Sequence, residues 1–316
     1  MNKNKKSIIY IGIFLACILA YVFLAMMQPN KENKKETLNV VTSFNPVYVA
    51  TLNIVEGVEN VKVSNITSAV KGCPHEYQLS PKNMEDILSS DLFIINGLGM
   101  EAYLEDIAAR SKDVKVIDAS KNIHVEKEEA KHEEHKEEHK HEHDHEHGVN
   151  PHVWLDIDKY ILQVEEITKN LVETDSKNKD KYIKNKEIYI SKLNELKKEM
   201  SGLDNLKNTS TVIFHNSSEY LLENLNIKVV DEVNIESESG VSANSLKNII
   251  DKVKLNNIKY IITDPSYSTK VPDQVYAETG AIVCKIDSLV NANETNIKDS
   301  YINTMKNNIE VLKKIK

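Results

Sequence analysis

The sequence has few cysteines and no marked cluster of positively charged residues beyond its first six positions, and it lacks the short motifs of several enzyme classes. Its 316 residues include three cysteines, too few for a disulfide framework, although pairing of Cys73 with Cys284 stays open. Beyond the first six residues no basic patch stands out, which argues against a nucleic-acid partner. No nucleophile elbow, His-Glu-Xaa-Xaa-His motif or phosphate-binding loop is present. These absences argue against common hydrolases and against an ATPase.

An apolar run near the N-terminus is the clearest topological signal. Ser7–Met27 contains 21 residues without a charged side chain, close to the ~20 residues that a membrane-spanning helix needs. We expect an uncleaved membrane anchor here, with lipidation at Cys17 or simple signal cleavage as the alternatives. Each alternative exports the rest of the chain. We therefore expect an extracytoplasmic protein, anchored at the cell surface or in the periplasm, with residues 1–37 as anchor or signal and polar tether.

A second unusual segment, Glu126–His147, consists of Glu, Asp, Lys and His with a single Ala. Ten acidic and four lysine side chains give it a net charge of −6 with neutral His, most of the −8 of the whole chain. Because it has no apolar side chains to bury, we expect a mobile loop over residues 124–148. Neutral imidazole is a frequent transition-metal ligand, so we expect weak auxiliary metal binding by this loop, with a passive insert as the alternative. Its histidines are His132, His135, His139, His141, His143, His145 and His147.

Short apolar or β-branched runs alternate with helical patterns, which predicts α/β architecture with parallel sheets. They fall into two sets of four. The first set is Leu38–Phe44, Val61–Thr67, Leu92–Leu98 and Val114–Ser120, and the second is Thr211–Asn216, Ile227–Val233, Tyr260–Pro265 and Ala281–Ser288. We therefore expect two lobes, each with a four-stranded, mainly parallel sheet flanked by helices.

A strongly helical stretch separates the two sets. Its first helix begins near Asp156 or Asp158, either of which can cap it. Its second helix ends near Ser201-Gly202, and about 22 residues of helix span roughly 33 Å. We expect a lobe at 38–155, a linking helical segment at 156–202 and a second lobe at 203–316, with one long rigid helix joining the lobes beside a cleft.

Four candidate metal ligands follow predicted strands or precede the linking helices: His75, His152, His215 and Asp287. Ligands of open α/β sheets bind at the carboxyl ends of strands. Three imidazoles and one carboxylate form a complete four-coordinate set for Zn²⁺. A single histidine after a strand is more often an ordinary hydrogen-bonded residue, and it is the joint placement of the four that favours a metal site.

Ordered motifs along the chain resemble a known family. They are Pro74-His75-Glu76-Tyr77 with Pro81, Asn96-Gly97-Leu98-Gly99-Met100-Glu101, Asn150-Pro151-His152-Val153-Trp154-Leu155-Asp156, Tyr182 with Asn185 and Tyr189, His215 with Tyr220, and Asp287-Ser288 before Tyr301, Met305 and Asn308. From about residue 38 onward the chain resembles the zinc/manganese solute-binding proteins of ABC transporters (cluster A-I), and its histidine-rich insert is typical of the zinc-binding branch. The resemblance implies that the four candidates are the metal ligands, in the cleft between the lobes.

The same resemblance implies a non-enzymatic, monomeric protein that delivers Zn²⁺ to an ABC permease with a separate ATPase. Two positions depart from the family pattern, since Cys73 and Asn150 stand where Asp is usual. Neither position is a ligand in the family. Cys73 is a neutral substitution or, alternatively, a soft ligand or redox switch.

Three alternatives to a zinc carrier stay open. Manganese-binding relatives tend to have a carboxylate as third ligand, whereas His215 makes this set nitrogen-rich, which suits zinc better. Three histidines holding zinc with an open fourth position would suit an enzyme, and ligation by Asp287 argues against that arrangement. A surface adhesin or metal buffer that displays the histidine-rich loop is the third alternative.

Overall fold

The computed structural model describes residues 37–67, 77–104, 107, 114–125, 149–233, 241–290 and 296–315. All elements below belong to one compact unit, Leu38–Lys316. Among the helices of these ranges, none has the length and apolar content to cross a membrane. The candidate span Ser7–Met27 and the histidine-rich segment lie outside the described residues.

The first lobe is built on a four-stranded parallel sheet with strand order β2-β1-β3-β4. Its strands are β1 (Leu38–Thr42), β2 (Val61–Asn65), β3 (Leu92–Ile95) and β4 (Val116–Asp118), and its helices are α2 (Asn45–Ile54) and α3 (Pro81–Leu88). The central strand β3, Leu-Phe-Ile-Ile, is buried throughout, as expected for a parallel strand covered on both faces. The side chain of Ser80 caps α3 by accepting a hydrogen bond from the backbone of Asn83.

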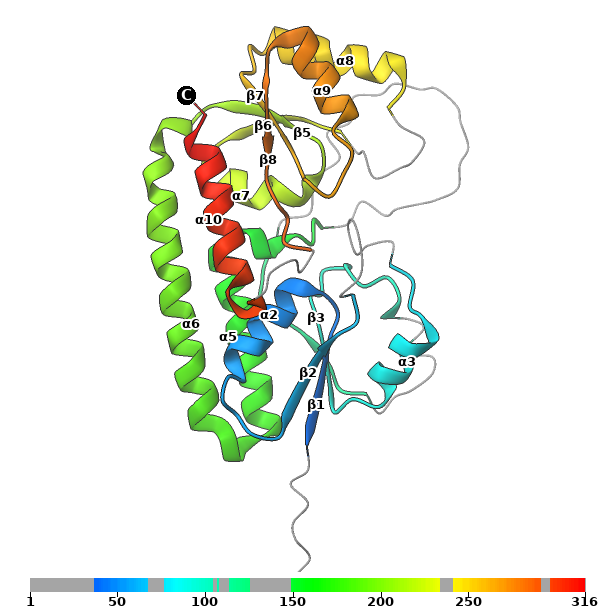
Figure 1. Cartoon of the computed structure of the whole chain (residues 1–316), viewed down its shortest axis with the longest axis vertical. Helices are drawn as coiled ribbons and strands as arrows, with labels where there is room; N and C mark the ends of the chain where they lie inside the picture. The colour runs from blue at the N-terminus through cyan, green and yellow to red at the C-terminus, as the bar shows by residue number, and fades with distance from the viewer. Residues whose placement is uncertain are drawn as a thin grey trace, which may run out of the picture. The chain divides into compact units, whose positions relative to one another are not determined.

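The second lobe repeats this plan with strand order β6-β5-β7-β8, again entirely parallel (Figure 1). Its strands are β5 (Ser210–Ile213), β6 (Lys228–Glu232), β7 (Tyr260–Thr263) and β8 (Ile282–Lys285), and its helices are α7 (Glu219–Asn224), α8 (Ala243–Leu255) and α9 (Lys270–Thr279). Helix α9 ends at Gly280, whose φ of 75° is the left-handed conformation that glycine adopts easily. The prediction of two four-stranded parallel lobes is confirmed.

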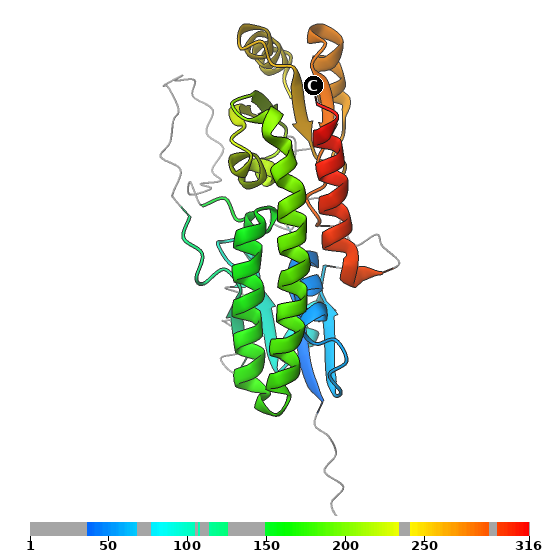
Figure 2. The ribbon, with the colours of Figure 1, turned by 90° about the vertical axis from the view of Figure 1, so that its left-hand side faces the viewer.

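Three long helices pack together beside the sheets: α5 (Ile157–Thr174), α6 (Lys179–Met200) and α10 (Ser300–Lys313). Short 3₁₀ turns lie at Val153–Leu155, Ser176–Asn178, Ser201–Leu206, Asn216–Ser218 and Ile297–Asp299. Figure 2 shows α6 beside α5 and α10. Asp156 is the N-cap of α5, since its carboxylate accepts from the backbone N–H groups of Asp158 and Lys159. The single long helix predicted between the lobes is α6.

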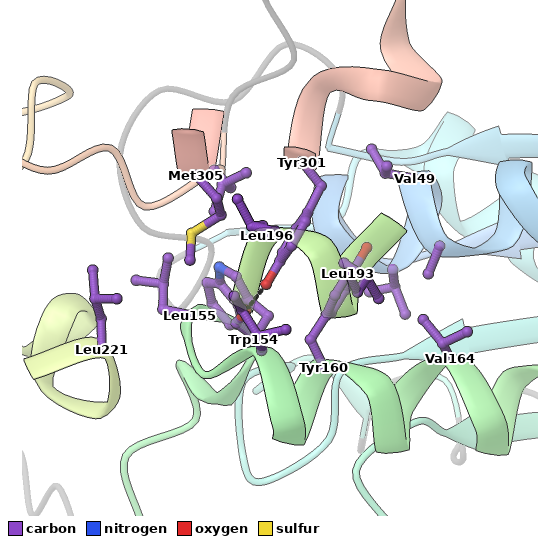
Figure 3. Packing of buried hydrophobic residues seen from close by; sticks show 14 of the residues in the cluster. Val49, Trp154, Leu155, Tyr160, Val164, Leu193, Leu196, Leu221, Tyr301 and Met305 are labelled. Atoms are coloured by element: carbon purple, nitrogen blue, oxygen red, sulfur yellow. Dashed lines mark hydrogen bonds between the residues drawn. The ribbon is translucent and has the colours of Figure 1, made fainter. Parts of the chain in front are cut away.

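Three buried tyrosines pack against one another in the core where these helices meet. Tyr160 of α5 stacks on Tyr301 of α10 with ring centroids 3.9 Å apart, and its hydroxyl donates to the carbonyl of Pro46. Tyr189 of α6 lies edge-on to Tyr160 at 6.3 Å. Figure 3 shows Tyr160, Tyr301 and Trp154 among the surrounding aliphatic side chains. Burial raises the pKa of Tyr160 and Tyr301 well above the ordinary value, so both hydroxyls stay protonated and act as donors.

Candidate metal centre

Buried polar residues gather at the carboxyl ends of strands in both lobes. Asn96 follows β3 and Ser120 follows β4, while His215 follows β5 and Asp264 follows β7; all four are buried. Strand β3 itself is apolar and buried throughout. This concentration of polar groups at one end of each sheet is where ligands of parallel α/β folds bind.

His152 is fully buried, and its ring orientation is set by Asn150. The ring Nδ1 lies 2.8 Å from Asn150 Oδ1, and the backbone N–H of His152 donates to the same oxygen at 3.0 Å. A carbonyl oxygen only accepts, so Nδ1 carries the proton and Nε2 keeps its lone pair. That is the tautomer a neutral histidine needs to bind a metal through Nε2.

His215 occupies the turn after β5. Its backbone has φ of 157° and ψ of 141°, a conformation rare for residues other than glycine. Its Nδ1 accepts a hydrogen bond from the backbone N–H of Ser217 at 3.0 Å, and its ring stacks on Tyr267 with centroids 5.1 Å apart. Sparsely populated backbone conformations of this kind concentrate at functional sites.

The structure brings His152 and His215 together from the two lobes. Their ring centroids are 5.0 Å apart and their planes are nearly perpendicular, at 84°. Trp154 lies 5.1 Å from His152 on another side. Within the described ranges, no group of three or more His, Cys, Asp or Glu side chains is placed to hold one ion. His75, the first predicted ligand, lies outside those ranges, as does Cys73.

Asp287, the fourth predicted ligand, follows β8 in the same sheet as His215. Its backbone is held by Asn308 of α10, which accepts from the Asp287 N–H at 2.9 Å and donates to its carbonyl at 2.9 Å. Its carboxylate Oδ1 accepts from the backbone N–H of Leu289 at 2.8 Å. The loop that carries Asp287 is therefore fixed, and ligation by this residue stays a prediction.

Asp264 is a polar residue of this region that the sequence analysis missed. It is buried, and its carboxylate accepts from the backbone N–H of Ser266 at 2.6 Å and of Ser288 at 2.8 Å. It thus holds the turn that leads to Tyr267 and the segment that follows Asp287. The available signal was its position near the end of the predicted strand Tyr260–Pro265, as His215 is near the end of Thr211–Asn216; the observed strand β7 ends at Thr263, directly before Asp264.

Glu101 of the first lobe is linked to Pro151, the residue before His152, through hydrogen bonds that pass through Asn96. It is buried and accepts from the backbone N–H groups of Asn96 and Gly97 at 2.7 and 3.1 Å. The side chain of Asn96 in turn donates to the carbonyl of Pro151 at 3.0 Å. Burial raises the pKa of Glu101 to about 7, although these hydrogen bonds oppose the shift.

Cys284 lies in β8 as a buried free thiol. Burial raises its pKa to about 11, so the reactive thiolate is scarce at neutral pH.

Comparisons with known proteins agree with this arrangement. The family described as ZnuA, zinc-uptake complex component A, periplasmic, matches residues 40–315. The high-affinity zinc uptake system protein ZnuA of Bacillus subtilis is 33% identical over 289 residues, which cover 89% of this chain and 88% of that protein. The zinc-binding lipoprotein AdcA of Streptococcus pneumoniae is 30% identical over 312 residues; the match covers 96% of this chain but only 60% of AdcA.

One further relative and one solved structure complete the comparison. The manganese-binding lipoprotein MntA of Halalkalibacterium halodurans is 26% identical over 280 residues, with 87% of each chain covered. The crystal structure of the Zn(II)-bound ZnuA-like domain of S. pneumoniae AdcA matches with a TM-score of 0.69 and 26% identity, covering 88% of this chain and 98% of that one. The predicted family is confirmed: the chain belongs to the ZnuA family of metal solute-binding proteins.

Proposed function

We propose that this chain captures Zn²⁺ outside the cytoplasm and delivers it to an ABC permease powered by a separate ATPase. The observation that carries the proposal is the pair of buried imidazoles, His152 and His215, contributed by the two lobes with ring centroids 5.0 Å apart. Membership of a family described as a component of a zinc-uptake complex supports a transport role over an enzymatic one.

The ligand set of the proposed site is His75, His152, His215 and Asp287. Two structural features support metal binding by His152 and Asp287. His152 presents the lone pair of Nε2 because Asn150 holds the proton on Nδ1. The Asp287 loop is fixed by Asn308 through two hydrogen bonds, so little chain entropy has to be lost when the carboxylate binds an ion.

Zinc is the proposed cargo rather than manganese. Imidazole nitrogen suits zinc, whereas manganese prefers oxygen ligands, and His215 makes the proposed set rich in nitrogen. The sequence matches point in the same direction, since the zinc-uptake relative is 33% identical and the manganese-binding relative 26% identical.

Membrane attachment through residues 7–27 would keep the monomeric carrier close to its permease. The lipoprotein names of AdcA and MntA support an anchored protein. The histidine-rich loop would add weaker zinc sites and act as a local buffer when zinc is scarce. Its last histidine, His147, is five residues before His152, so an ion released by the loop is already near the proposed site.

The proposal is tested by equilibrium dialysis of the full chain against equal concentrations of zinc and manganese, followed by metal analysis. The expected result is retention of zinc in large excess over manganese. Equal retention, or a preference for manganese, would overturn zinc as the cargo.

A further inference from the structure

Two amide groups lie in a hydrogen-bonded line between the rings of His152 and His215. The first is the side-chain amide of Asn150, and the second is the peptide group that joins Asn216 to Ser217. We call these two groups the amide bridge. His152 Nδ1 contacts Asn150 Oδ1 at 2.8 Å, and Asn150 Nδ2 donates to the carbonyl of Asn216 at 3.0 Å. On the other side of that same peptide group, the N–H of Ser217 donates to His215 Nδ1 at 3.0 Å.

The orientation of the Asn150 amide follows from its partners. Its nitrogen faces two acceptors, the carbonyl of Asn216 and Oε2 of Glu219, the latter at 2.8 Å. Its oxygen faces the backbone N–H of His152 at 3.0 Å, which can only donate. A flipped amide would place oxygen against two oxygens and N–H against N–H. The amide therefore has a single favourable orientation, and both hydrogens of its nitrogen are used.

All hydrogen bonds of the bridge consequently point the same way, from His152 towards His215. His152 donates from Nδ1, so its Nε2 has a lone pair. His215 accepts at Nδ1, so the proton of its neutral ring is on Nε2. Amide groups in series polarise one another, which strengthens this shared direction. The two imidazoles are thus held in opposite tautomers, and of the two only His152 has its lone pair on Nε2.

We propose that Asn150 is a positioning residue that couples the two imidazoles across the lobes and sets their tautomers, so that His152 binds zinc first and His215 follows after a tautomer change. This inference rests on the proposed zinc function. For His215 to bind through Nε2, that nitrogen loses its proton to solvent while Nδ1 gains one, with no net change in protons. The Ser217 N–H bond is then lost and the peptide group after Asn216 has to turn.

Contacts from α7 and α5 hold the bridge in place. The hydroxyl of Tyr220 donates to the backbone carbonyl of Asn150 at 2.7 Å, and Lys159 lies over the Tyr220 ring with Nζ 4.8 Å from its centroid. Asn150 itself is buried, with 7% of its surface exposed. Water therefore has little access to replace these bonds. Loss of the Asn150 amide would leave the His152 ring without its directing partner, and it would remove the bond that orients the Asn216–Ser217 peptide group against His215.

The test is tautomer analysis of the full chain labelled with ¹⁵N-histidine, by long-range ¹H–¹⁵N correlation without metal, followed by zinc competition titration. In the unmodified chain we expect the proton of His152 on Nδ1 and that of His215 on Nε2. Asn150→Ala should leave both rings as tautomer mixtures and weaken zinc binding about 10–100-fold, the usual effect of losing a group that orients a metal ligand. Asn150→Asp keeps the acceptor for His152 and removes the donor to Asn216. It should restore the His152 tautomer alone, together with most of the affinity.

Asn185→Ala is the matched control. The Asn185 amide also donates to two carbonyls, those of Ile54 and Glu56, but it joins α6 to the end of α2 and contacts neither imidazole. The control should lower thermal stability without changing either tautomer. A proton on Nδ1 of His215 in the unmodified chain would overturn the inference, and so would unchanged tautomers in a folded Asn150→Ala. Because tautomers are measured without metal, failure of the zinc proposal would appear separately, as absence of tight binding by the unmodified chain.

Discussion

The indole of Trp154 donates from Nε1 to the backbone carbonyl of Ser288 at 2.8 Å. Trp154 follows His152 by two residues, and Ser288 directly follows Asp287. One buried hydrogen bond thus ties the segment of one proposed ligand to the segment of another, 134 residues away. The Trp154 carbonyl accepts from the hydroxyl of Tyr301 at 2.7 Å, and the ring packs edge-on against Phe44 at 4.7 Å. These contacts hold both segments in place before an ion arrives.

Replacing Trp154 by Phe should destabilise the chain and weaken zinc binding. The variant keeps an aromatic ring but leaves the buried Ser288 carbonyl without its donor, which costs about 1–3 kcal/mol. Urea unfolding measures the stability and competition titration the affinity. Tyr276→Phe, at a half-exposed ring of α9, is the control for an aromatic change. Equal unfolding free energies for Trp154→Phe and the unmodified chain would contradict the role given to this bond.

Stability should depend on pH through Glu101. Its pKa is about 7 in the fold, against an ordinary value of 4.5. Between these values the unfolded chain has released the proton and the folded chain has not. This group therefore makes the free energy of unfolding fall as pH rises from about 4.5 to about 7, by about 3 kcal/mol, and adds no further change above that.

Glu101→Gln should remove this part of the pH dependence. The measurement is the difference in unfolding free energy between the variant and the unmodified chain, followed from pH 4.5 to 8. Glu85→Gln, at an exposed position of α3, controls for the loss of one carboxylate. A difference that stays constant across this pH range would show that Glu101 does not titrate as described.

Asp287→Asn should weaken zinc binding with little change in the fold. The amide oxygen of Asn can still accept from the backbone N–H of Leu289, and the backbone bonds to Asn308 are kept. What disappears is the negative charge that a zinc ligand supplies. A competition titration and a thermal melt, run side by side, separate the two effects. Unchanged affinity would remove Asp287 from the ligand set.

Deletion of Lys127–His147 should lower the number of bound zinc ions while the tightest binding step stays nearly the same. A segment without apolar side chains has to be ordered for each ion it binds, which weakens its sites. Isothermal titration calorimetry gives both quantities. If the deletion abolishes the tight step, the loop is part of the primary site; if one ion binds in both forms, the loop is a passive insert.

Much of the fold follows from local pattern. Alternating apolar strands and helices predict two parallel sheets, and of the two candidate caps, Asp156 and Asp158, it is Asp156 that begins α5. The predicted strands are too long, because neighbouring elements take over their ends. The run Leu38–Phe44 stops at Thr42, since Phe44 is the N-cap of α2. In the run Ala281–Ser288 the strand ends at Lys285, and two residues later the backbone N–H of Asp287 donates to Asn308 of α10 instead of to a strand.

Only part of the candidate metal site could be predicted from the sequence. His215 and Asp287 were selectable because they follow strands, and His152 because it lies between the acidic loop and the linking helices. Asp264 also follows a strand but was overlooked. The role of Asn150 was not predictable, since its partners Asn216 and Glu219 are 66 and 69 residues away. Such bonds depend on how the lobes pack against each other, and this packing cannot be deduced from the spacing of residues in the sequence.

We expect His152 and His215 to bind one zinc ion tightly between the lobes. Competition titration against a chromophoric chelator, with the unmodified chain, His152→Ala, His215→Ala and the exposed control His124→Ala, tests it most directly. We expect one tight ion in the unmodified chain and in His124→Ala, and its loss in both other variants, which remain folded. Unchanged tight binding in folded His152→Ala or His215→Ala would show that the residue replaced is not a ligand of the tight site.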